Sequence, residues 1–308
     1  MHVIDSSLFS PYEKALLWDE PLSRYAFSLC GGPCAGLFRI EGDEMLENLV
    51  RCCIQAGYPY KVLGGMTNVL VSDAGFDGVV LLNRKGTISH QLMHDGSVQL
   101  NAGSGVGMAA VVRYCIENEF TGMEWAAGLP GTVGGAVYGN AGAFGTETAD
   151  LFTRGHVIDE TGAVHELNKD EMGYAYRSSF LKARKENNVL LDASFLLQTG
   201  EKELILAKCE ENREKRSSTQ PVTENSLGSV FKNPDGESAG KLIQAAGLKG
   251  FSIGQAAVSM KHANFITTTK GVTSEDYRSL VSHVQRVVFE QFGVLLEPEI
   301  ELLGFGVK

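Results

Sequence analysis

A glycine-rich stretch from Trp125 to Gly145, WAAGLPGTVGGAVYGNAGAFG, constrains the fold more than any other part of the chain. Seven of the eighteen residues from Gly128 to Gly145 are glycine and none is charged, so the stretch is not a solvated linker. Glycine permits positive φ and lacks the Cβ that would hold a ligand off the main chain, and successive N–H groups form a concavity for anionic oxygens. The composition therefore indicates either a diphosphate-binding loop or a tight turn with close strand packing.

A second segment of the same kind lies upstream, at Val62-Leu-Gly-Gly-Met-Thr-Asn-Val-Leu-Val-Ser-Asp73. An apolar strand leads into a glycine pair, and Thr67 and Asn68 can bond to their own backbone before the next strand begins. Two such loops imply one extended phosphate ligand. They resemble the paired pyrophosphate loops of the FAD-binding fold of vanillyl-alcohol oxidase and p-cresol methylhydroxylase, in which FAD lies between two α+β subdomains. The resemblance implies cofactor contacts from Gly64, Gly65, Met66, Thr67, Asn68, Gly128, Gly131, Thr132, Gly134, Gly135, Asn140, Ala141 and Gly142.

Composition limits the kinds of partner. The 308 residues are 44% hydrophobic and carry a formal charge of −10, which suits a soluble protein with two or three domains and argues against nucleic acid or an anionic membrane as the main partner. The N-terminus lacks a signal-peptide pattern, and no apolar run approaches the length of a membrane span. We therefore expect a cytoplasmic protein with reduced cysteines. As a separate expectation, we take it to be a monomer. Cys30 and Cys34 have no matching second pair, so we expect no metal site.

Local patterns predict the main elements. Helical spacing of apolar residues predicts helices over Asp43–Gln55 and Met108–Glu117 and a third that includes Tyr277 and Phe292, with Gly57 and Gly293 as C-terminal stops. Residues 156–167 read as a hairpin. A strand is expected from Val294 to Leu303, interrupted by Pro298, which suits an edge position or a bend.

The domain organisation follows from a change in composition. A helix from Lys202 becomes strongly polar from Glu210 to Gln220 and ends at Pro221, which marks the candidate domain boundary. We expect a first FAD-binding subdomain at 1–93, a second at 94–215 and a C-terminal α+β substrate-binding domain at 222–308. The overall fold class is α+β.

A glycine run at Gly103-Ser-Gly-Val-Gly107 superficially mimics a dinucleotide-binding fingerprint. The third glycine comes too soon, and no acidic residue closes a following strand at the usual distance. A Rossmann-type NAD domain is therefore discounted.

Five motifs, in order along the chain, resemble the UDP-N-acetylenolpyruvoylglucosamine reductase (MurB) family of bacterial cell-wall synthesis. They are GLPGTVGGAVYGNAGA in the glycine-rich stretch, YRSS at 176–179, GSVFKNP at 228–234, KHANF at 261–265 and LEPEIELLG at 296–304. The similarity covers roughly residues 20 to 304, and the spacing between Arg177 and Ser229 resembles the shorter subclass of the family. It implies a non-covalent FAD, NADPH as the hydride donor and an enolpyruvyl nucleotide sugar as the substrate.

The resemblance also implies roles for three side chains. Arg177, with its planar and permanently charged fork, would stabilise charge that develops on the substrate carboxylate. Ser229 matches the family's proton donor, and Glu299 matches an acidic residue that assists at the carboxylate. Outside the family, these residues would be read as a surface ion pair, a turn residue and an edge-strand charge.

Other matched positions suggest substrate contacts. Tyr176, Lys232 and Asn233 resemble substrate-binding residues, although the last two also suit a cap before Pro234. His262 is the only histidine inside a matched motif, and a structural role is expected for it. Three departures from the family pattern touch the flavin loops: Leu29 and Cys30 before Gly31, Met66 in place of a commoner glycine, and Gly139 where methionine is usual.

Two rival functions stay open at this stage. One is a flavoprotein oxidase of the same fold; many of these tether FAD through a histidine in the first phosphate loop, and residues 62–73 contain none. The other is a nucleotide-sugar-binding protein without turnover, against which the intact Arg177, Ser229 and Glu299 argue.

Overall fold

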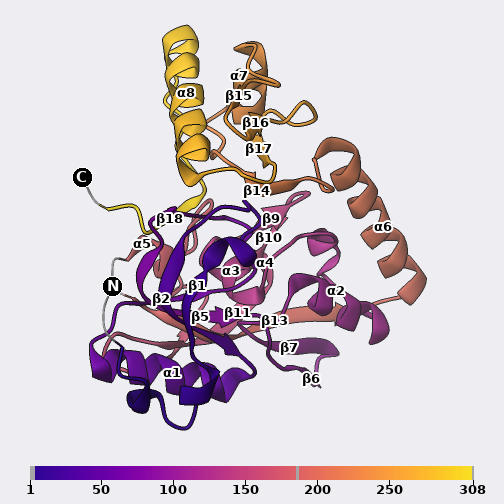
Figure 1. The fold of residues 1–308 in the computed structure, drawn as a ribbon. Helices are drawn as coiled ribbons and strands as arrows, with labels where there is room; N and C mark the ends of the chain where they lie inside the picture. The colour runs from indigo at the N-terminus through magenta and orange to yellow at the C-terminus, as the bar shows by residue number, and fades with distance from the viewer. Residues whose placement is uncertain (1–3, 185–186, 307–308) are drawn as a thin grey trace.

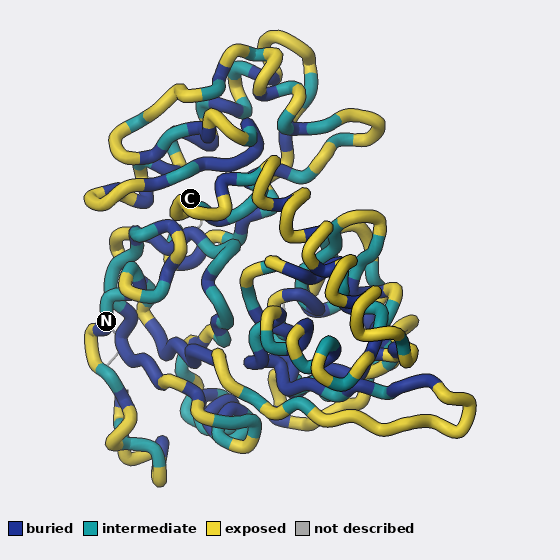
Figure 2. Tube along the Cα trace, turned by 90° about the vertical axis from the view of Figure 1, so that its right-hand side faces the viewer, coloured by how far each residue is buried: buried dark blue, intermediate teal, exposed yellow. Residues whose placement is uncertain are grey.

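The computed structural model describes residues 4–184 and 187–306. Two sheets with their helices form the lower part of the molecule in Figure 1, and a smaller α+β unit, drawn in orange and yellow, lies above them. Each of these three regions has a buried interior of its own, seen as dark blue segments in Figure 2. The mixed sheets and helices agree with the predicted α+β class.

The first sheet has the strand order β1-β2-β5-β3. Strands β2 and β5 are parallel, as are β3 and β5, while β1 pairs with β2 in the antiparallel sense. The apolar face of helix α1 covers the sheet, and Gly57, at φ 67°, ends this helix as predicted. The elements are β1 (Leu17–Pro21), β2 (Pro33–Ile40), α1 (Asp43–Ala56), β3 (Tyr60–Leu63), β4 (Val69–Val71) and β5 (Phe76–Asn83).

The second sheet has the order β12-β11-β13-β7-β6, and β8 also pairs with β13. Its buried face packs against helices α2 and α3 in one large apolar cluster. The predicted hairpin is confirmed, because β11 and β12 pair antiparallel on either side of Gly162. The elements are β6 (Ile88–Leu92), β7 (Ser97–Gly103), α2 (Met108–Glu117), β8 (Phe120–Thr121), β11 (Phe152–Ile158), β12 (Val164–Asn168), α5 (Phe180–Ala183), β13 (Val189–Thr199) and α6 (Lys202–Thr219).

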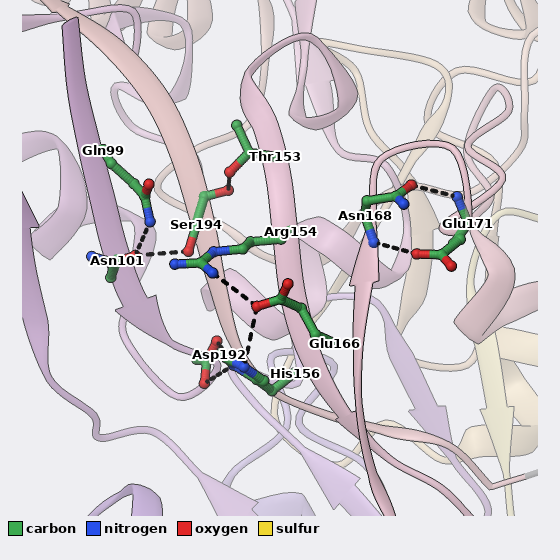
Figure 3. A network of polar contacts seen from close by, with 10 residues as sticks. All are labelled: Gln99, Asn101, Thr153, Arg154, His156, Glu166, Asn168, Glu171, Asp192 and Ser194. Carbon is green, nitrogen blue, oxygen red and sulfur yellow. Dashed lines mark hydrogen bonds and ion pairs between the residues drawn. The ribbon is translucent and has the colours of Figure 1, made fainter. Parts of the chain in front are cut away.

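The other face of the second sheet carries a polar network (Figure 3). Arg154 donates to Glu166 at 2.8 Å, and His156 Nδ1 lies 2.9 Å from an oxygen of Asp192 on the neighbouring strand. These side chains are about 40 to 50% exposed. Such cross-strand pairs contribute modestly to sheet stability, and here they mark the face that is turned to solvent.

The glycine-rich stretch folds into short elements instead of a plain loop. After a 3₁₀ turn at Glu124–Ala126 comes helix α3 (Val133–Tyr138), and the hydroxyl of its N-cap, Thr132, accepts a hydrogen bond from Gly135 N at 3.4 Å. A small hairpin of β9 (Gly142–Ala143) and β10 (Thr146–Glu147) then leads into α4 (Thr148–Leu151).

The C-terminal unit is a sheet of order β14-β17-β16-β15 with two helices packed against it. Helix α8 begins with a capping box at Thr273 and Asp276 and ends at Gly293, which has φ 70°. The elements are β14 (Asn225–Ser229), α7 (Ala239–Ala245), β15 (Ser252–Ile253), β16 (Ala256–Val258), β17 (Phe265–Thr268) and α8 (Ser274–Phe292).

The expected strand from Val294 to Leu303 is wrong over most of its length. Only β18 (Glu301–Leu303) is a strand, and it pairs in parallel with β4 of the first subdomain. Pro298 forms an isolated bridge with Phe231, flanked by hydrogen bonds from Lys232 N to Glu297 O and from Glu299 N to Val230 O, and this pairing does not extend into a ladder. Pro298 itself has no N–H to donate to a longer one. The chain end therefore returns from the upper unit to strand β4 of the first subdomain.

Sheet pairing bears on where the proposed domains meet. Strand β6 belongs to the second sheet, so the first boundary, placed after residue 93, lies inside that sheet. We propose that it falls between β5 and β6 instead. Strand β18 lies in the proposed C-terminal domain, yet within the described part of the chain it pairs with β4 of the first subdomain and with no other strand. The division of the chain otherwise stays a proposal.

Candidate active site

Arg177 and Glu299, 122 positions apart in the sequence, meet where the second subdomain faces the chain end. Arg177 Nε lies 3.0 Å from Glu299 Oε1, and both side chains are about four-fifths buried. The guanidinium also donates to two backbone carbonyls of the glycine-rich stretch, at 3.5 Å to Asn140 and 3.2 Å to Gly142. The Nε–H is nevertheless not aimed at an acceptor, so the contact with Glu299 is ionic and leaves one buried donor unpaired.

A tight turn holds Arg177 in place. Ala175 and Ser178 exchange backbone hydrogen bonds, and Arg177 between them has φ 55°, which is uncommon for a residue with a side chain. Ser179 Oγ donates to Tyr138 O at 2.8 Å, which anchors the turn to α3. Such backbone strain persists only where the surrounding contacts enforce it. These contacts therefore fix the position from which the Arg177 side chain extends toward Glu299.

The backbone of Glu299 is hydrogen-bonded both to the C-terminal unit and to the first glycine loop. Glu299 N donates to Val230 O at 2.8 Å, and Asn68 Nδ2 of the first glycine loop donates to Glu299 O at 3.2 Å. Burial raises the pKa of the Glu299 carboxyl above its ordinary value, and the charges of Arg177, Lys182 and Lys232 offset part of this effect. The side chain is thus inclined to hold a proton more firmly than an exposed glutamate.

Ser229 is the last residue of β14 and is half-buried. Gly228, before it, has φ 76°. Val230, after it, accepts the hydrogen bond from Glu299 N, so Ser229 is adjacent in sequence to a residue that contacts Glu299. Asn264 fixes this segment by bonding both sides of Phe231: it accepts from Phe231 N at 3.0 Å and donates to Phe231 O at 2.8 Å.

Asn264 is a positioning residue that we did not single out from the sequence. Its only signal was its place within the KHANF motif at 261–265. In the same motif, His262 Nδ1 accepts from Asn264 N at 3.2 Å, and burial lowers the pKa of His262. A neutral imidazole that accepts a backbone hydrogen bond agrees with the structural role that we expected for it.

The three expected substrate contacts lie beside the same site but are partly engaged by the protein. Tyr176 is half exposed, and its ring lies under Arg177 at 5.2 Å. Lys232 Nζ pairs with Glu297 at 2.6 Å. Asn233 N donates to the Tyr176 hydroxyl at 3.4 Å, while its own Oδ1 accepts from Ala239 N at 3.1 Å. Asn233 therefore has the capping contact that its alternative reading predicted.

The two glycine loops lie directly against each other. A Cβ at Gly64 would overlap Thr132 Oγ1 and lie 3.0 Å from Thr132 Cγ2, and a Cβ at Gly65 would lie 2.9 Å from Gly131 Cα. Close packing of protein on protein therefore explains these glycines. It also brings the loops side by side, as one extended ligand would require.

Other features of the loops leave room for such a ligand. Within the described residues, the backbone N–H groups of Gly65, Met66 and Thr67 have no hydrogen-bond partner in the protein. A Cβ at Gly135 would meet nothing closer than Thr132 Oγ1 at 3.8 Å, so no protein contact requires glycine there. Free N–H groups beside uncrowded backbone are what a diphosphate needs, and the loops fit the dinucleotide cofactor that their sequence suggests.

Met66 has a backbone conformation that is uncommon for a residue with a side chain. Its φ is 54°, a conformation that costs a residue with a Cβ roughly 1 to 2 kcal/mol. The side chain is almost fully buried among Leu63, Val71 and other apolar residues, which offsets this cost. Leu29 also lies in the left-handed region, at φ 60°.

Known families match most of the chain. A model of the FAD binding domain matches residues 34–168, which hold both glycine loops. A model of the UDP-N-acetylenolpyruvoylglucosamine reductase C-terminal domain matches residues 220–303. The fold and the paired loops thus define a protein with an FAD-binding domain joined to a specialised C-terminal domain.

Full-length relatives make the assignment more specific. The chain is 39% identical over 291 residues to a UDP-N-acetylenolpyruvoylglucosamine reductase of Lachnoclostridium phytofermentans, which covers 94% of this chain and 93% of the relative. It is 38% identical to one from Listeria monocytogenes, with 94% and 95% covered. The crystal structure of the Thermus caldophilus enzyme superimposes with a TM-score of 0.76 at 31% identity, covering 94% of this chain and 98% of that one. The chain belongs to the UDP-N-acetylenolpyruvoylglucosamine reductase family.

Two structural findings complete the description. None of the helices in residues 4–184 and 187–306 combines the length and apolar character that a membrane span requires. In the same residues, no three side chains of the metal-binding types gather into a group that could hold an ion.

Proposed function

We propose that this protein uses NADPH to reduce UDP-N-acetylglucosamine enolpyruvate to UDP-N-acetylmuramate, a step in the synthesis of peptidoglycan precursors, with FAD bound non-covalently. Family membership supports the reaction. The observation that carries the assignment of residues is the Arg177–Glu299 contact beside Ser229, because three remote segments converge there on a partly buried, charged site.

The cofactor would lie along the two glycine loops. The N–H groups of Gly65, Met66 and Thr67 would bind its diphosphate, and the uncrowded backbone at Gly135 would let it approach the second loop. Held there, FAD would supply the hydride chemistry, in which a hydride from NADPH reaches the terminal vinyl carbon of the substrate.

The protein's own residues would stabilise the charge that develops on the substrate carboxylate and donate the proton to the adjacent carbon. Arg177 lies in a low-dielectric setting and has an unpaired Nε–H, so it can stabilise charge that develops on the substrate carboxylate. Ser229 would donate a proton to the carbon next to that carboxylate, because such a carbanion is basic enough to take it. Glu299, which lies 3.0 Å from Arg177 Nε, would assist at the same carboxylate.

Substrate recognition would come from the neighbouring side chains. Tyr176, whose ring contacts Arg177, and Lys232, which pairs with Glu297, are the better candidates for binding the nucleotide portion. Asn233 would also bind substrate in this proposal, although its capping contact with Ala239 limits how far its side chain can turn. A cytoplasmic location and a monomeric state are further proposals.

An anaerobic spectrum of the purified protein tests the function. We expect NADPH to bleach the flavin absorbance and UDP-N-acetylglucosamine enolpyruvate to restore it. Recovery only after air is admitted would favour an oxidase, and absence of flavin would favour a nucleotide-sugar-binding protein.

Gly135→Ala separates a cofactor contact from a packing requirement. Alanine is preferred over glycine inside helices by roughly 0.5 to 1 kcal/mol, and the added Cβ meets no protein atom within 3.8 Å, so the flavin-free protein should become more stable. We expect flavin affinity to fall by about tenfold, equivalent to about 1.4 kcal/mol. Chemical unfolding of flavin-free protein and flavin titration measure the two effects.

Gly139→Ala is the matched control for this variant. Gly139 lies in the same stretch at φ −95°, and a Cβ there would be 3.5 Å from Gly135 O. Its flavin affinity should stay at the wild-type value. Unchanged flavin affinity in Gly135→Ala would remove Gly135 from the proposed cofactor site.

A further inference from the structure

A second ion pair lies beside the Arg177–Glu299 contact and has no role in the proposed reaction. Lys182 Nζ, from α5, lies 2.8 Å from Glu301 Oε1, from β18. The Lys182 side chain is only 17% exposed, which is unusual for lysine without a partner of opposite charge. Thus the short segment from Arg177 to Lys182 supplies two cations to two carboxylates near the chain end.

The pair has a third member in Tyr138 of α3. The Lys182 ammonium lies 5.8 Å from the centre of the Tyr138 ring, and burial together with the Glu301 charge raises the pKa of the Tyr138 hydroxyl to about 12. The tyrosine therefore stays neutral and can donate to Glu301. Lys182 and Tyr138 both come from the second FAD-binding subdomain, whereas Glu301 lies on the strand that returns from the C-terminal unit.

The backbone connects this pair to Glu299. Glu301 N donates to Asn68 O at 2.9 Å, and Asn68 Nδ2 donates to Glu299 O at 3.2 Å, so one asparagine holds both carboxylate-bearing residues. The positive charge of Lys182 also acts directly on Glu299. A change at Lys182 or Glu301 therefore reaches Glu299 through both the strand and the local charge.

We propose that Lys182 is a positioning residue: through its ion pair with Glu301 it holds the strand that follows Glu299 against the second subdomain and balances the charge that Glu299 faces. This inference rests on the proposed function only in giving Glu299 a part in the reaction. Lys182 itself has no assigned contact with a substrate or cofactor.

The charges around Glu299 decide what each substitution does. The cations that act on it are Arg177 from the turn before α5, Lys182 from α5 and Lys232 from the segment after β14, the last of which is paired with Glu297. Glu301 is the carboxylate that Lys182 neutralises. Removing Lys182 leaves Glu301 as an uncompensated negative charge, and removing the charge of Glu301 leaves Lys182 as an uncompensated positive charge.

The test is a titration of the Glu299 carboxyl in the flavin-loaded protein. Glutamate labelled with ¹³C at the side-chain carboxyl reports protonation by NMR, and Glu299→Gln identifies the signal. We expect the midpoint to move up by about one pH unit in Lys182→Met and down by a similar amount in Glu301→Gln. The double variant should return close to the wild-type midpoint.

Two further variants complete the design. Lys208→Met removes a lysine that pairs with Glu211 at the same 2.8 Å but is half exposed, and it should leave the midpoint unchanged. Lys182→Arg keeps the charge and should preserve most of the wild-type titration. If Lys182→Met does not fold, Glu301→Gln alone tests the proposal: a lower midpoint supports it, and a higher or unchanged midpoint contradicts it.

A purely structural pair would give a different pattern. If substitution only loosened the strand, the Glu299 midpoint would shift in the same direction in both single variants. That result, or an unchanged midpoint in both, would overturn the proposal. The pH dependence of flavin reoxidation by the substrate, measured on the same samples, should follow the titration. If the wild type shows no turnover while the titrations behave as expected, the proposed function fails and the positioning role stands.

Discussion

Replacing Ser229 with alanine is expected to leave NADPH-dependent bleaching of the flavin near the wild-type rate and to slow reoxidation by the enolpyruvyl substrate by about 100-fold to 10,000-fold. Loss of a positioned proton donor has an effect of this size when proton transfer belongs to the slow step. Alanine keeps the backbone of β14, and the hydrogen bond between Glu299 N and Val230 O does not involve the serine side chain. Stopped-flow absorbance under anaerobic conditions measures the two half-reactions separately.

Ser226→Ala is the control for this prediction. Ser226 lies on the same strand, is also half-buried and pairs with Thr267 of β17, but it is not next to the Glu299 segment. Both half-reactions should stay near wild type in this variant. Slow bleaching with normal reoxidation in Ser229→Ala would contradict the role of proton donor.

Local sequence patterns predicted the helices well because their signals are local. Helices α1 and α8 follow apolar residues at helical spacing, and both end at a glycine in the left-handed region, Gly57 and Gly293. The start and end of α2 were likewise predicted from the glycine that precedes it and the apolar face that follows. These features depend on a few neighbouring residues and not on the rest of the fold.

The end of the chain was predicted less well because its partners are remote. Residues 294–300 have the apolar composition of a strand, yet only Glu301–Leu303 pair, and they do so with β4, more than 200 positions earlier. No local pattern indicates which edge a strand will join. The same limit applies to Lys182 and Glu301, whose contact depends on that pairing.

The candidate site was predicted through family resemblance and not from local pattern. Nothing in the residues around Arg177 or Glu299 indicates that they approach within 3.0 Å, and each alone resembles an ordinary surface charge. The glycines illustrate a further limit. The sequence left open whether they serve ligand binding or close packing, and the structure shows both settings: crowded at Gly64 and open at Gly135.

Gly64→Val is expected to abolish flavin retention, because the two glycine loops can no longer lie against each other. The new side chain would overlap Thr132, whose own position is fixed as the N-cap of α3. Relief requires separation of the loops, and overpacking of this kind costs about 1 to 3 kcal/mol even before any ligand is lost. The ratio of flavin to protein after gel filtration and the thermal unfolding of the flavin-free protein measure the two consequences.

Gly107→Ala provides the comparison for this variant in the same region. Gly107 has φ −68°, and a Cβ there would lie 3.9 Å from Gly131 O, so alanine should be accepted with normal flavin content. Full flavin retention in Gly64→Val would mean that the loops can separate without loss of the cofactor, and the proposal that both loops bind one extended ligand would then be wrong. Loss of flavin in Gly64→Val together with normal flavin content in Gly107→Ala would show that cofactor binding depends on the contact between Gly64 and Thr132. The first variant disturbs that contact, and the second leaves it intact.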